Sequence, residues 1–349
     1  MRISMKKRLG LAILVIALLL SSTTGVYATE TVEEPSETVE TLPGETTPEE
    51  AKKIFPDTYT VDTESAMYAV LSALEPELKS DQIFVYDATN DTMFYTMTRE
   101  GDKLYPASIT KLFSAYVALQ YLDSEEVLTA GDELELVKPG SSVAYIGRGH
   151  QLYTRTVVEA MMLPSGNDAA MVLAAAAGRR IAGDQSISAA EAVAVFVDEM
   201  NRMARELGFE KSHFANPDGY HLGCHYTCLN DMARIAKLAL ENKTISRYIR
   251  RYQDDVVFVS GQTITWKNTN LLLSPDDGFY RGDAIGMKTG HTRQAEYCLM
   301  SAFKCKDGRT IVIGAFGCDD EYDRLRDILK LVKACQEQLN LEAAQQKAG

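Results

Sequence analysis

Apolar and polar residues follow two different rhythms along this chain. Residues 82–87 and 93–97 partly alternate around the turn residues Thr89, Asn90 and Asp91, a pattern that predicts two strands joined in a β-hairpin. Late in the chain the character changes again, and strands are predicted at residues 256–259, 263–266, 285–288, 297–303 and 310–316. The predicted strands therefore cluster towards both ends of the folded part.

Between these strands, apolar residues recur at the spacing of an α-helix. A helix is predicted to begin at or just after Ser108, because apolar residues recur every three or four positions from Leu112 to Leu122. Similar spacing predicts helices over residues 154–162, 168–177, 189–207 and 231–241, and a closing helix with one apolar face over residues 325–339. This order predicts an α/β (α+β) fold: a sheet from both ends of the chain, helices on its faces and an inserted all-helical lobe. An active site falls naturally between the two lobes.

The first 28 residues have the parts of an export signal. Four basic residues form a head, residues 9–20 are an apolar stretch short for a membrane span, and small residues precede an expected cleavage site after Ala28. An uncleaved anchor is the alternative interpretation. The protein is therefore expected outside the cytoplasm, in contact with a membrane only through this segment if it is not removed.

Composition and charge restrict the function further. Residues 29–54 are rich in Glu, Thr, Pro and Ser and are expected to form a disordered acidic linker. The net charge is −13, and cleavage after Ala28 lowers it to −17, because four basic and no acidic residues are lost. Such an acidic protein is a poor partner for nucleic acid. Residues 55–341 are predicted to be the folded part, and residues 342–349 a tail.

Six cysteines follow the linker, without the spacing of a disulfide-dense scaffold. The best candidate pair is Cys224 and Cys228, which lie in a loop that contains a glycine. His221 and His225 lie in the same loop. A zinc site built from these four residues is the alternative to a disulfide.

The first of three candidate chemical motifs pairs a serine with a lysine. Ser108 and Lys111 are three positions apart, so on a helix Lys111 reaches the serine oxygen and can act as its base. Because an ammonium group cannot act as a base, burial and the positive charge of Lys288 are expected to favour the neutral amine. The helix start also favours negative charge on the Ser108 oxygen.

The second motif, Ser165-Gly166-Asn167, lies on a tight loop between two predicted helices. Ser165 can relay a proton from the base to a leaving nitrogen, and Asn167 can hold a substrate amide. Taken alone, each motif has an ordinary structural explanation, such as a helix cap, a turn or an edge strand. Three such accidents in this order are much less expected than one shared cause.

The third motif, Lys288-Thr289-Gly290, follows a predicted strand. Lys288 and Thr289 can bind a carboxylate, by charge and by hydroxyl. Gly290 is expected to leave room for a substrate backbone along the strand. The backbone amides of Ser108 and His291 can stabilise an oxyanion.

Together the motifs resemble those of the penicillin-binding-protein and serine β-lactamase superfamily. The chain is most similar to the low-molecular-mass D-alanyl-D-alanine carboxypeptidases, serine peptidase family S11. The resemblance covers about residues 79–333 and rests on residues 106–111, 163–170, 206–219, 266–272 and 286–292. Within it, Asn-Pro-Asp-Gly at residues 216–219 stands where the family has Asn-Pro-His-Gly.

The resemblance implies a β-lactamase/transpeptidase-like fold with an antiparallel sheet, and a serine acyl-enzyme mechanism. Ser108 would attack the bond between two terminal D-alanines of a peptidoglycan stem peptide on the cell-wall side of the bacterial membrane. D-Alanine would leave, and water would release the acyl group. β-Lactam antibiotics are expected to acylate the same serine, and neither a metal nor an organic cofactor is expected. Arg324 is similar to an arginine that the family uses near the substrate carboxylate.

Two features depart from the family pattern. Glu296 replaces a glycine, which leaves the local strand packing in question. The resemblance also places the loop of Cys224 and Cys228 beside the active site, so a local disulfide is favoured over zinc. The alternatives are a β-lactamase, for which no Glu-x-x-Leu-Asn loop is found between Asn167 and Lys288, and a non-catalytic wall-binding protein that kept the fold.

Overall fold

The computed structural model describes residues 55, 59–99, 101–209 and 211–348. The predicted export signal and the predicted linker, residues 1–28 and 29–54, lie outside these described residues. Within the described part, none of the helices combines the length and the apolar character needed to span a bilayer. The predicted tail begins inside a helix, α9 (Asp323–Ala348).

A five-stranded sheet built from both ends of the described chain is the scaffold. Its strands are β1 (Gln82–Asp87), β2 (Thr92–Thr98), β7 (Ala284–Thr292), β8 (Glu296–Lys304) and β9 (Thr310–Cys318). They lie in the order β2-β1-β9-β8-β7, and every neighbouring pair is antiparallel. The prediction of one sheet from two distant parts of the sequence is confirmed.

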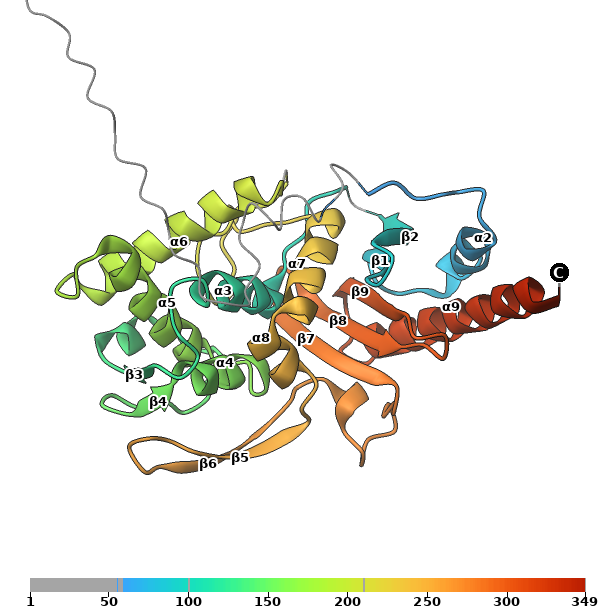
Figure 1. Ribbon diagram of the computed structural model, residues 1–349. Helices are drawn as coiled ribbons and strands as arrows, with labels where there is room; N and C mark the ends of the chain where they lie inside the picture. Colours follow the sequence, from blue (N-terminus) through green and yellow to red (C-terminus); the bar gives the residue numbers. More distant parts are fainter. Residues whose placement is uncertain (1–54, 56–58, 100, 210, 349) are drawn as a thin grey trace, which may run out of the picture. The chain divides into compact units, whose positions relative to one another are not determined.

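Both faces of this sheet are covered, which explains why the alternation along its strands is only partial. Ile83 and Val85 of β1 pack in a hydrophobic cluster with α2 (Ala66–Ser72) and α9, whereas Phe84 and Tyr86 pack in a second cluster with the helical lobe. Successive strand side chains point to opposite faces, so a strand buried on both sides is apolar throughout. Figure 1 shows α9 on one side of the strands, and α7 (Leu229–Glu241) and α8 (Lys243–Ile249) on the other.

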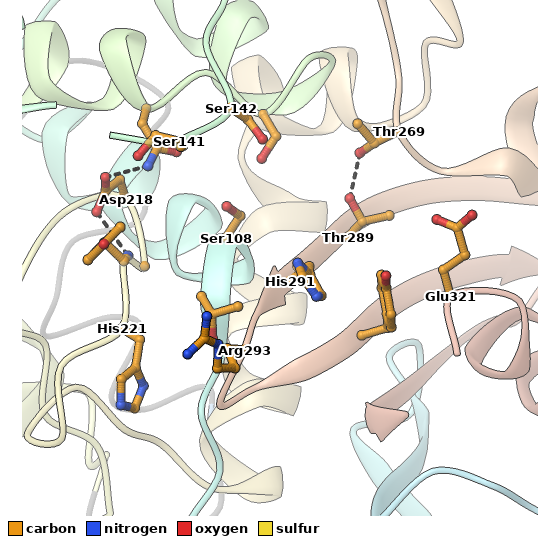
Figure 2. Close-up of a pocket in the computed structure, with 18 of the residues that line it drawn as sticks. Ser108, Ser141, Ser142, Asp218, His221, Thr269, Thr289, His291, Arg293 and Glu321 are labelled. Atoms are coloured by element: carbon orange, nitrogen blue, oxygen red, sulfur yellow. Dashed lines mark hydrogen bonds between the residues drawn. The ribbon is translucent and has the colours of Figure 1, made fainter. Parts of the chain in front are cut away.

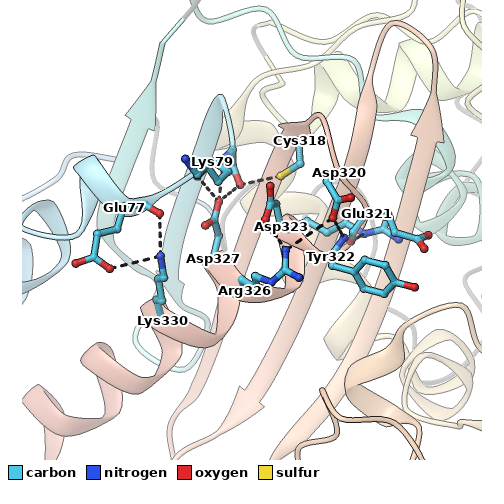
Figure 3. A network of polar contacts seen from close by, with 12 residues as sticks. Glu77, Lys79, Cys318, Asp320, Glu321, Tyr322, Asp323, Arg326, Asp327 and Lys330 are labelled. Atoms are coloured by element: carbon cyan, nitrogen blue, oxygen red, sulfur yellow. Dashed lines mark hydrogen bonds and ion pairs between the residues drawn. The ribbon is translucent and has the colours of Figure 1, made fainter.

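A polar network holds the first part of α9 to the segment before β1. Asp327 Oδ2 accepts hydrogen bonds from Lys79 N (2.8 Å), Ser80 N (2.8 Å) and Ser80 Oγ (2.7 Å). Ser80 Oγ also lies 3.1 Å from Cys318 Sγ at the end of β9. Figure 3 shows these contacts together. They fix the turn of α9 that follows Arg324, one of the predicted site residues.

The helical lobe is inserted between β2 and β7, as predicted. It contains α3 (Thr110–Ala118), α4 (Thr154–Met162), α5 (Asn167–Ala182) and α6 (Ala189–Glu206), with the short strands β3 (Val127–Thr129) and β4 (Gln151–Tyr153). Turns of 3-10 helix lie at Glu75–Glu77, Ala107–Ile109, Asp132–Leu136 and Leu271–Leu273. The alanine-rich α5 packs so closely on α6 that a Cβ on Gly178 would lie only 1.8 Å from Ala192 O.

The strands predicted at residues 256–259 and 263–266 form a separate two-stranded sheet, β5 (Gln253–Val257) with β6 (Thr263–Lys267). β5 begins three residues earlier than predicted, because its first residues are polar and partly exposed and carry no apolar signal. It ends at Val257, where Phe258 N donates to Gln262 O and closes the turn.

Candidate active site

A cavity of about 1030 Å³ lies where the helical lobe, β7 and the loop at residues 218–221 meet. Most of the predicted site residues line it: Ser108, Ser165, Asn167, Thr289, Gly290, His291 and Arg324. The other two, Lys111 and Lys288, are buried, with exposed fractions of 0% and 1%. Figure 2 shows Ser108 between Asp218 on one side and Thr289 and His291 on the other. The structure therefore brings all three motifs to one place.

Ser108 lies in the 3-10 turn that leads directly into α3. Ala107, just before it, has a φ of 46°, a left-handed conformation that is uncommon for a residue with a side chain. Lys111 Nζ lies 2.8 Å from Ser108 Oγ, 2.7 Å from Asn167 Oδ1 and 2.9 Å from Asp218 O. The amine therefore contacts the serine directly, and two oxygens from elsewhere in the chain hold it there.

Burial lowers the pKa of the Lys111 amine to about 8, against the negative charges of Asp218 and Asp168, which raise it. Lys288 is also fully buried, and its pKa lies well below the usual value because of burial and the charges of Lys111 and Arg324. The charge of Lys111 thus disfavours a charged Lys288, whereas the expected effect of Lys288 on the pKa of Lys111 is not among the causes found for Lys111. Desolvation is thus the main reason that the neutral form of Lys111 is accessible.

The oxygens around Lys111 determine where its lone pair points. The backbone carbonyl of Asp218 can only accept a hydrogen bond. Asn167 Nδ2 donates to Asp218 Oδ2 (2.6 Å), so Asn167 Oδ1 is the atom that faces Lys111, and it also accepts. These two acceptors take both N–H groups of a neutral amine. Its lone pair then faces the Ser108 hydroxyl, the arrangement that proton transfer from a serine requires.

Ser165 and Gly166 form the turn between α4 and α5. Ser165 has a φ of 63°, and a Cβ on Gly166 would lie 2.7 Å from Ala144 Cβ. Asp168 accepts hydrogen bonds from Ala144 N (2.8 Å) and Ile146 N (2.9 Å). This carboxylate ties the neighbouring loop to the second motif and fixes that side of the cavity.

Gly290 on β7 lies close to the turn that carries Ser108. A Cβ there would lie 2.9 Å from Pro106 O, 3.0 Å from Ala107 Cβ and 3.2 Å from Ser108 N. The glycine therefore allows β7 to approach the 3-10 turn that carries Ser108, the nucleophile turn of the sequence prediction. Gly290 also lines the cavity, and its predicted role of leaving room for a substrate backbone stays a prediction.

Lys288 lies beneath the cavity, where its Nζ donates to Thr289 O (3.1 Å). In this arrangement the Lys288 side chain is 1% exposed, so the predicted contact of its amine with a carboxylate stays a prediction. Thr289 does line it, and its hydroxyl is hydrogen-bonded to that of Thr269. His291 lies at the rim, largely exposed, and partial desolvation with the charge of Arg324 lowers the pKa of its ring.

Arg324 lines the cavity but uses part of its guanidinium to join three elements. Its Nε donates to Glu321 O (2.9 Å), and its Nη1 donates to Gly290 O (3.3 Å) and Cys298 O (3.0 Å). Its burial lowers the pKa of the guanidinium. Arg324 therefore lies in the cavity wall and helps to hold β7, β8 and α9 together, while its predicted place near the substrate carboxylate stays a prediction.

Sequence reasoning missed the part that Asp218 takes in this site. Its carboxylate and backbone carbonyl contact Asn167 and Lys111, and it is only 1% exposed. The segment 216–219 contains this residue, but no sequence pattern connects its charge with Lys111. The available signal was an aspartate at a position where the family has histidine.

The loop of Cys224 and Cys228 holds neither of the predicted arrangements. The expected disulfide is absent, since Cys224 is exposed, Cys228 is buried and both are free thiols. In the described part of the chain, no group of three or more His, Cys, Asp or Glu side chains is placed to hold a metal ion. Instead His225 Nε2 lies 2.8 Å from Thr110 Oγ1, so the loop packs through this histidine on the start of α3.

Glu296, the other departure, begins β8 with a φ of 53°, a conformation that suits glycine. It pairs with Thr292 of β7, so the two strands still meet at this position. The register of β8 against β9 shifts just after it, between Tyr297 and Leu299.

Comparisons with known proteins agree with this geometry. A family model described as D-alanyl-D-alanine carboxypeptidase matches residues 69–317. The D-alanyl-D-alanine carboxypeptidase DacF of Bacillus subtilis (strain 168) is 29% identical over 238 residues, which cover 66% of this chain and 56% of that protein. The D-alanyl-D-alanine carboxypeptidase of Streptomyces sp. (strain K15) is 32% identical over 237 residues, which cover 65% of this chain and 77% of that protein. The chain thus spans little more than half the length of the Bacillus relative.

Among solved structures, the crystal structure of the Streptomyces K15 DD-transpeptidase matches with a TM-score of 0.65 and 28% identity. The match covers 74% of this chain and 97% of that one. The predicted fold class, an antiparallel sheet flanked by helices with an inserted helical lobe, is therefore confirmed.

Proposed function

The chain belongs to the family of D-alanyl-D-alanine carboxypeptidases, and from this premise we propose that it is a serine-type carboxypeptidase that removes the terminal D-alanine of peptidoglycan stem peptides. The observation that carries the proposal is the 2.8 Å contact between Lys111 Nζ and Ser108 Oγ, beside a cavity that residues of all three motifs line. A buried amine of lowered pKa next to a serine is what an acyl-enzyme mechanism without a His-Asp pair needs.

In the acylation step, Ser108 Oγ attacks the carbonyl of the penultimate D-alanine and its proton passes to neutral Lys111. The backbone amides of Ser108 and His291 stabilise the oxyanion that forms. The C–N bond then breaks, and the leaving nitrogen receives the proton from Lys111 through the Ser165 hydroxyl. Asn167 orients Lys111, because its Oδ1 accepts a hydrogen bond from the amine. Water attacks the ester in the second step, with Lys111 again as base, and restores Ser108.

The terminal carboxylate of the substrate binds at the opposite end of the cavity, near Thr289, His291 and Arg324, which supply a hydroxyl, a ring and a guanidinium. Lys288 contributes from beneath, since an incoming carboxylate favours the protonated form of a nearby amine. No step requires a metal or an organic cofactor.

Peptidoglycan peptides ending in D-Ala-D-Ala and β-lactam antibiotics are the partners that this proposal implies. Because the substrate is part of the cell wall, the place of action is outside the cytoplasmic membrane. The export signal predicted at residues 1–28 supports that location. Residues 55–341 are proposed as the catalytic domain.

The test is to incubate the purified protein with diacetyl-Lys-D-Ala-D-Ala and measure free D-alanine, and to record its intact mass after penicillin treatment. We expect D-alanine release and a mass increase by one penicilloyl group, both lost in Ser108→Ala and both kept in Ser246→Ala, a serine on α8. If neither D-alanine nor a mass increase is found, the protein is a non-catalytic wall-binding relative.

Acyl transfer to an amine is the second candidate, because the solved relative bears the name DD-transpeptidase. Adding an amino-acid acceptor to the same assay distinguishes the two outcomes, since transfer forms a new peptide at the expense of hydrolysis. A β-lactamase would instead turn over penicillin rapidly. A penicilloyl-enzyme that persists for minutes excludes that alternative.

A further inference from the structure

Asp218 is a buried carboxylate beside the proposed base, and none of the roles above uses its charge. Its backbone oxygen accepts a hydrogen bond from Lys111 Nζ (2.9 Å). Its side chain accepts from Asn167 Nδ2 with Oδ2 (2.6 Å) and from Tyr220 N with Oδ1 (3.0 Å). One residue thus contacts both the amine and the amide that orients the amine.

The loop that carries Asp218 is fixed against the nucleophile turn. Gly219 has a φ of 81°, and a Cβ there would lie 1.8 Å from Ala107 O. Asn216 closes the loop, since its Oδ1 accepts from Gly219 N (2.8 Å) and its Nδ2 donates to Tyr220 O (2.7 Å). Asp218 is therefore held in place by the same turn that presents Ser108.

We propose that Asp218 is a positioning residue for the acylation step, which acts on the reaction through Asn167 and Lys111 and does not touch the substrate. The inference rests on the proposed function and adds a determinant to that same site. A carboxylate only accepts hydrogen bonds, so it holds the Nδ2 end of Asn167 and prevents the amide from reversing. A reversed amide would set NH₂ against the lysine and turn its lone pair away from the serine.

The charge of Asp218 also acts on the base. The charged groups that face Lys111 are Asp168 on α5, Asp218 in its loop and Lys288 on β7. Asp218 and Asp168 raise the pKa of Lys111 against the larger effect of burial. Removing the negative charge at position 218 therefore lowers the pKa of Lys111, and the neutral amine persists to lower pH.

The experiment measures the rate constant of Ser108 acylation by a fluorescent penicillin from about pH 5 to pH 9 in the wild-type protein and in Asp218→Asn. Asparagine keeps the shape of the side chain but not its charge. We therefore expect the acid limb of the pH–rate profile, where the acylation rate constant falls in acid, to shift to lower pH by about one unit. The plateau rate should fall by up to about tenfold, because Asn167 can then reverse. Asp198→Asn, an exposed carboxylate on α6, is the matched control and should leave the profile unchanged.

A second readout does not depend on activity. In a Ser108→Ala background, NMR titration of the Lys111 side chain reports its pKa directly, and this pKa should be lower with Asp218→Asn. If Asp218 has a purely structural role, its replacement should lower the melting temperature and the plateau acylation rate. The acid limb of the pH–rate profile and the pKa of Lys111 should then stay unchanged. If Asp218→Asn does not fold, Asp218→Ala, which removes the same charge and does not titrate, takes its place.

The outcomes separate the two proposals. An acid limb that stays in place in a folded variant, while the wild-type protein acylates normally, overturns this inference alone. A variant that slows only the release of the penicilloyl group overturns it as well, because the carboxylate then acts on water. If the wild-type protein is not acylated, the proposed function fails. The Lys111 titration still decides the role of Asp218 in that case: an unchanged pKa overturns it.

Discussion

Lys111 Nζ lies 2.8 Å from Ser108 Oγ, and no distant segment of the chain is needed to bring these two atoms together. The serine occupies the 3-10 turn and the lysine the first turn of α3, so helical geometry alone puts the two side chains on one face. Their burial and the contacts of the amine with Asn167 and Asp218 come from elsewhere in the chain. The pair itself is local, whereas the acidity of its lysine is a tertiary property.

Replacement of Lys111 by alanine should remove the base. We expect acylation of Ser108 by penicillin to fall about 10²- to 10⁴-fold, the usual loss when a general base is deleted. Intact mass and far-UV circular dichroism would separate loss of labelling from loss of fold. Lys304→Ala, an exposed lysine at the end of β8, should label like the wild-type protein. Normal labelling of the Lys111 variant would refute the role of this amine.

The acylation rate should rise with pH over the neutral range. Because burial lowers the pKa of Lys111 to about 8 and only the neutral amine is a base, the rate should fall about tenfold per pH unit well below pH 8. Stopped-flow acylation across this range measures the limb. A rate constant that is flat between about pH 6 and pH 8 would contradict this assignment.

Addition of one methyl group at Gly290 should impair the site more than the fold. The Cβ would lie 2.9 Å from Pro106 O, so β7 and the nucleophile turn must separate. We expect Gly290→Ala to destabilise the protein by about 1–3 kcal/mol and to slow acylation by about 10- to 100-fold. Gly282→Ala is the control, because its nearest contact would be Tyr280 Oη at 3.9 Å. Wild-type acylation by Gly290→Ala would show that the close approach is not needed.

His225 should make the protein less stable in acid. Its Nδ1 accepts from Ala215 N (3.1 Å), so Nε2 carries the proton that is shared with Thr110 Oγ1. Burial, with the charges of His213 and His221, lowers the pKa of His225 to about 3. The unfolded chain binds a proton below about pH 6.5 and the folded one does not, so stability falls as the pH drops towards 3, by about 1.4 kcal/mol per unit.

Urea unfolding at pH 7 and pH 5 measures this effect. The wild-type protein should lose about 2 kcal/mol of unfolding free energy through this group. His225→Gln removes the titration and should lose correspondingly less between the same two pH values. An equal loss in both proteins would show that His225 is not responsible.

Local periodicity predicted the longer elements of this fold but not the shorter ones. The strands around residues 82–98 and 284–318 and the helices from α3 to α7 repeat their apolar residues often enough to be recognised. β3, β4 and α8 contain three to seven residues, too few to establish a period. The first residues of β5 are polar on both faces of the strand and give no apolar alternation, so pairing with β6 decides their conformation.

The sequence by itself determined the serine–lysine pair, the two other motifs and a sheet drawn from both ends of the chain, because spacing along a helix or strand is a local property. Only the tertiary structure decided that Asp218 contacts and orients Asn167 and that Gly290 lets β7 approach the turn that carries Ser108. It also decided that Cys224 and Cys228 are free thiols. These features depend on atoms from segments far apart in the sequence, such as Lys111 and Asp218, which are 107 positions apart. No local pattern encodes how such segments come to face each other, because packing of the whole core sets their positions.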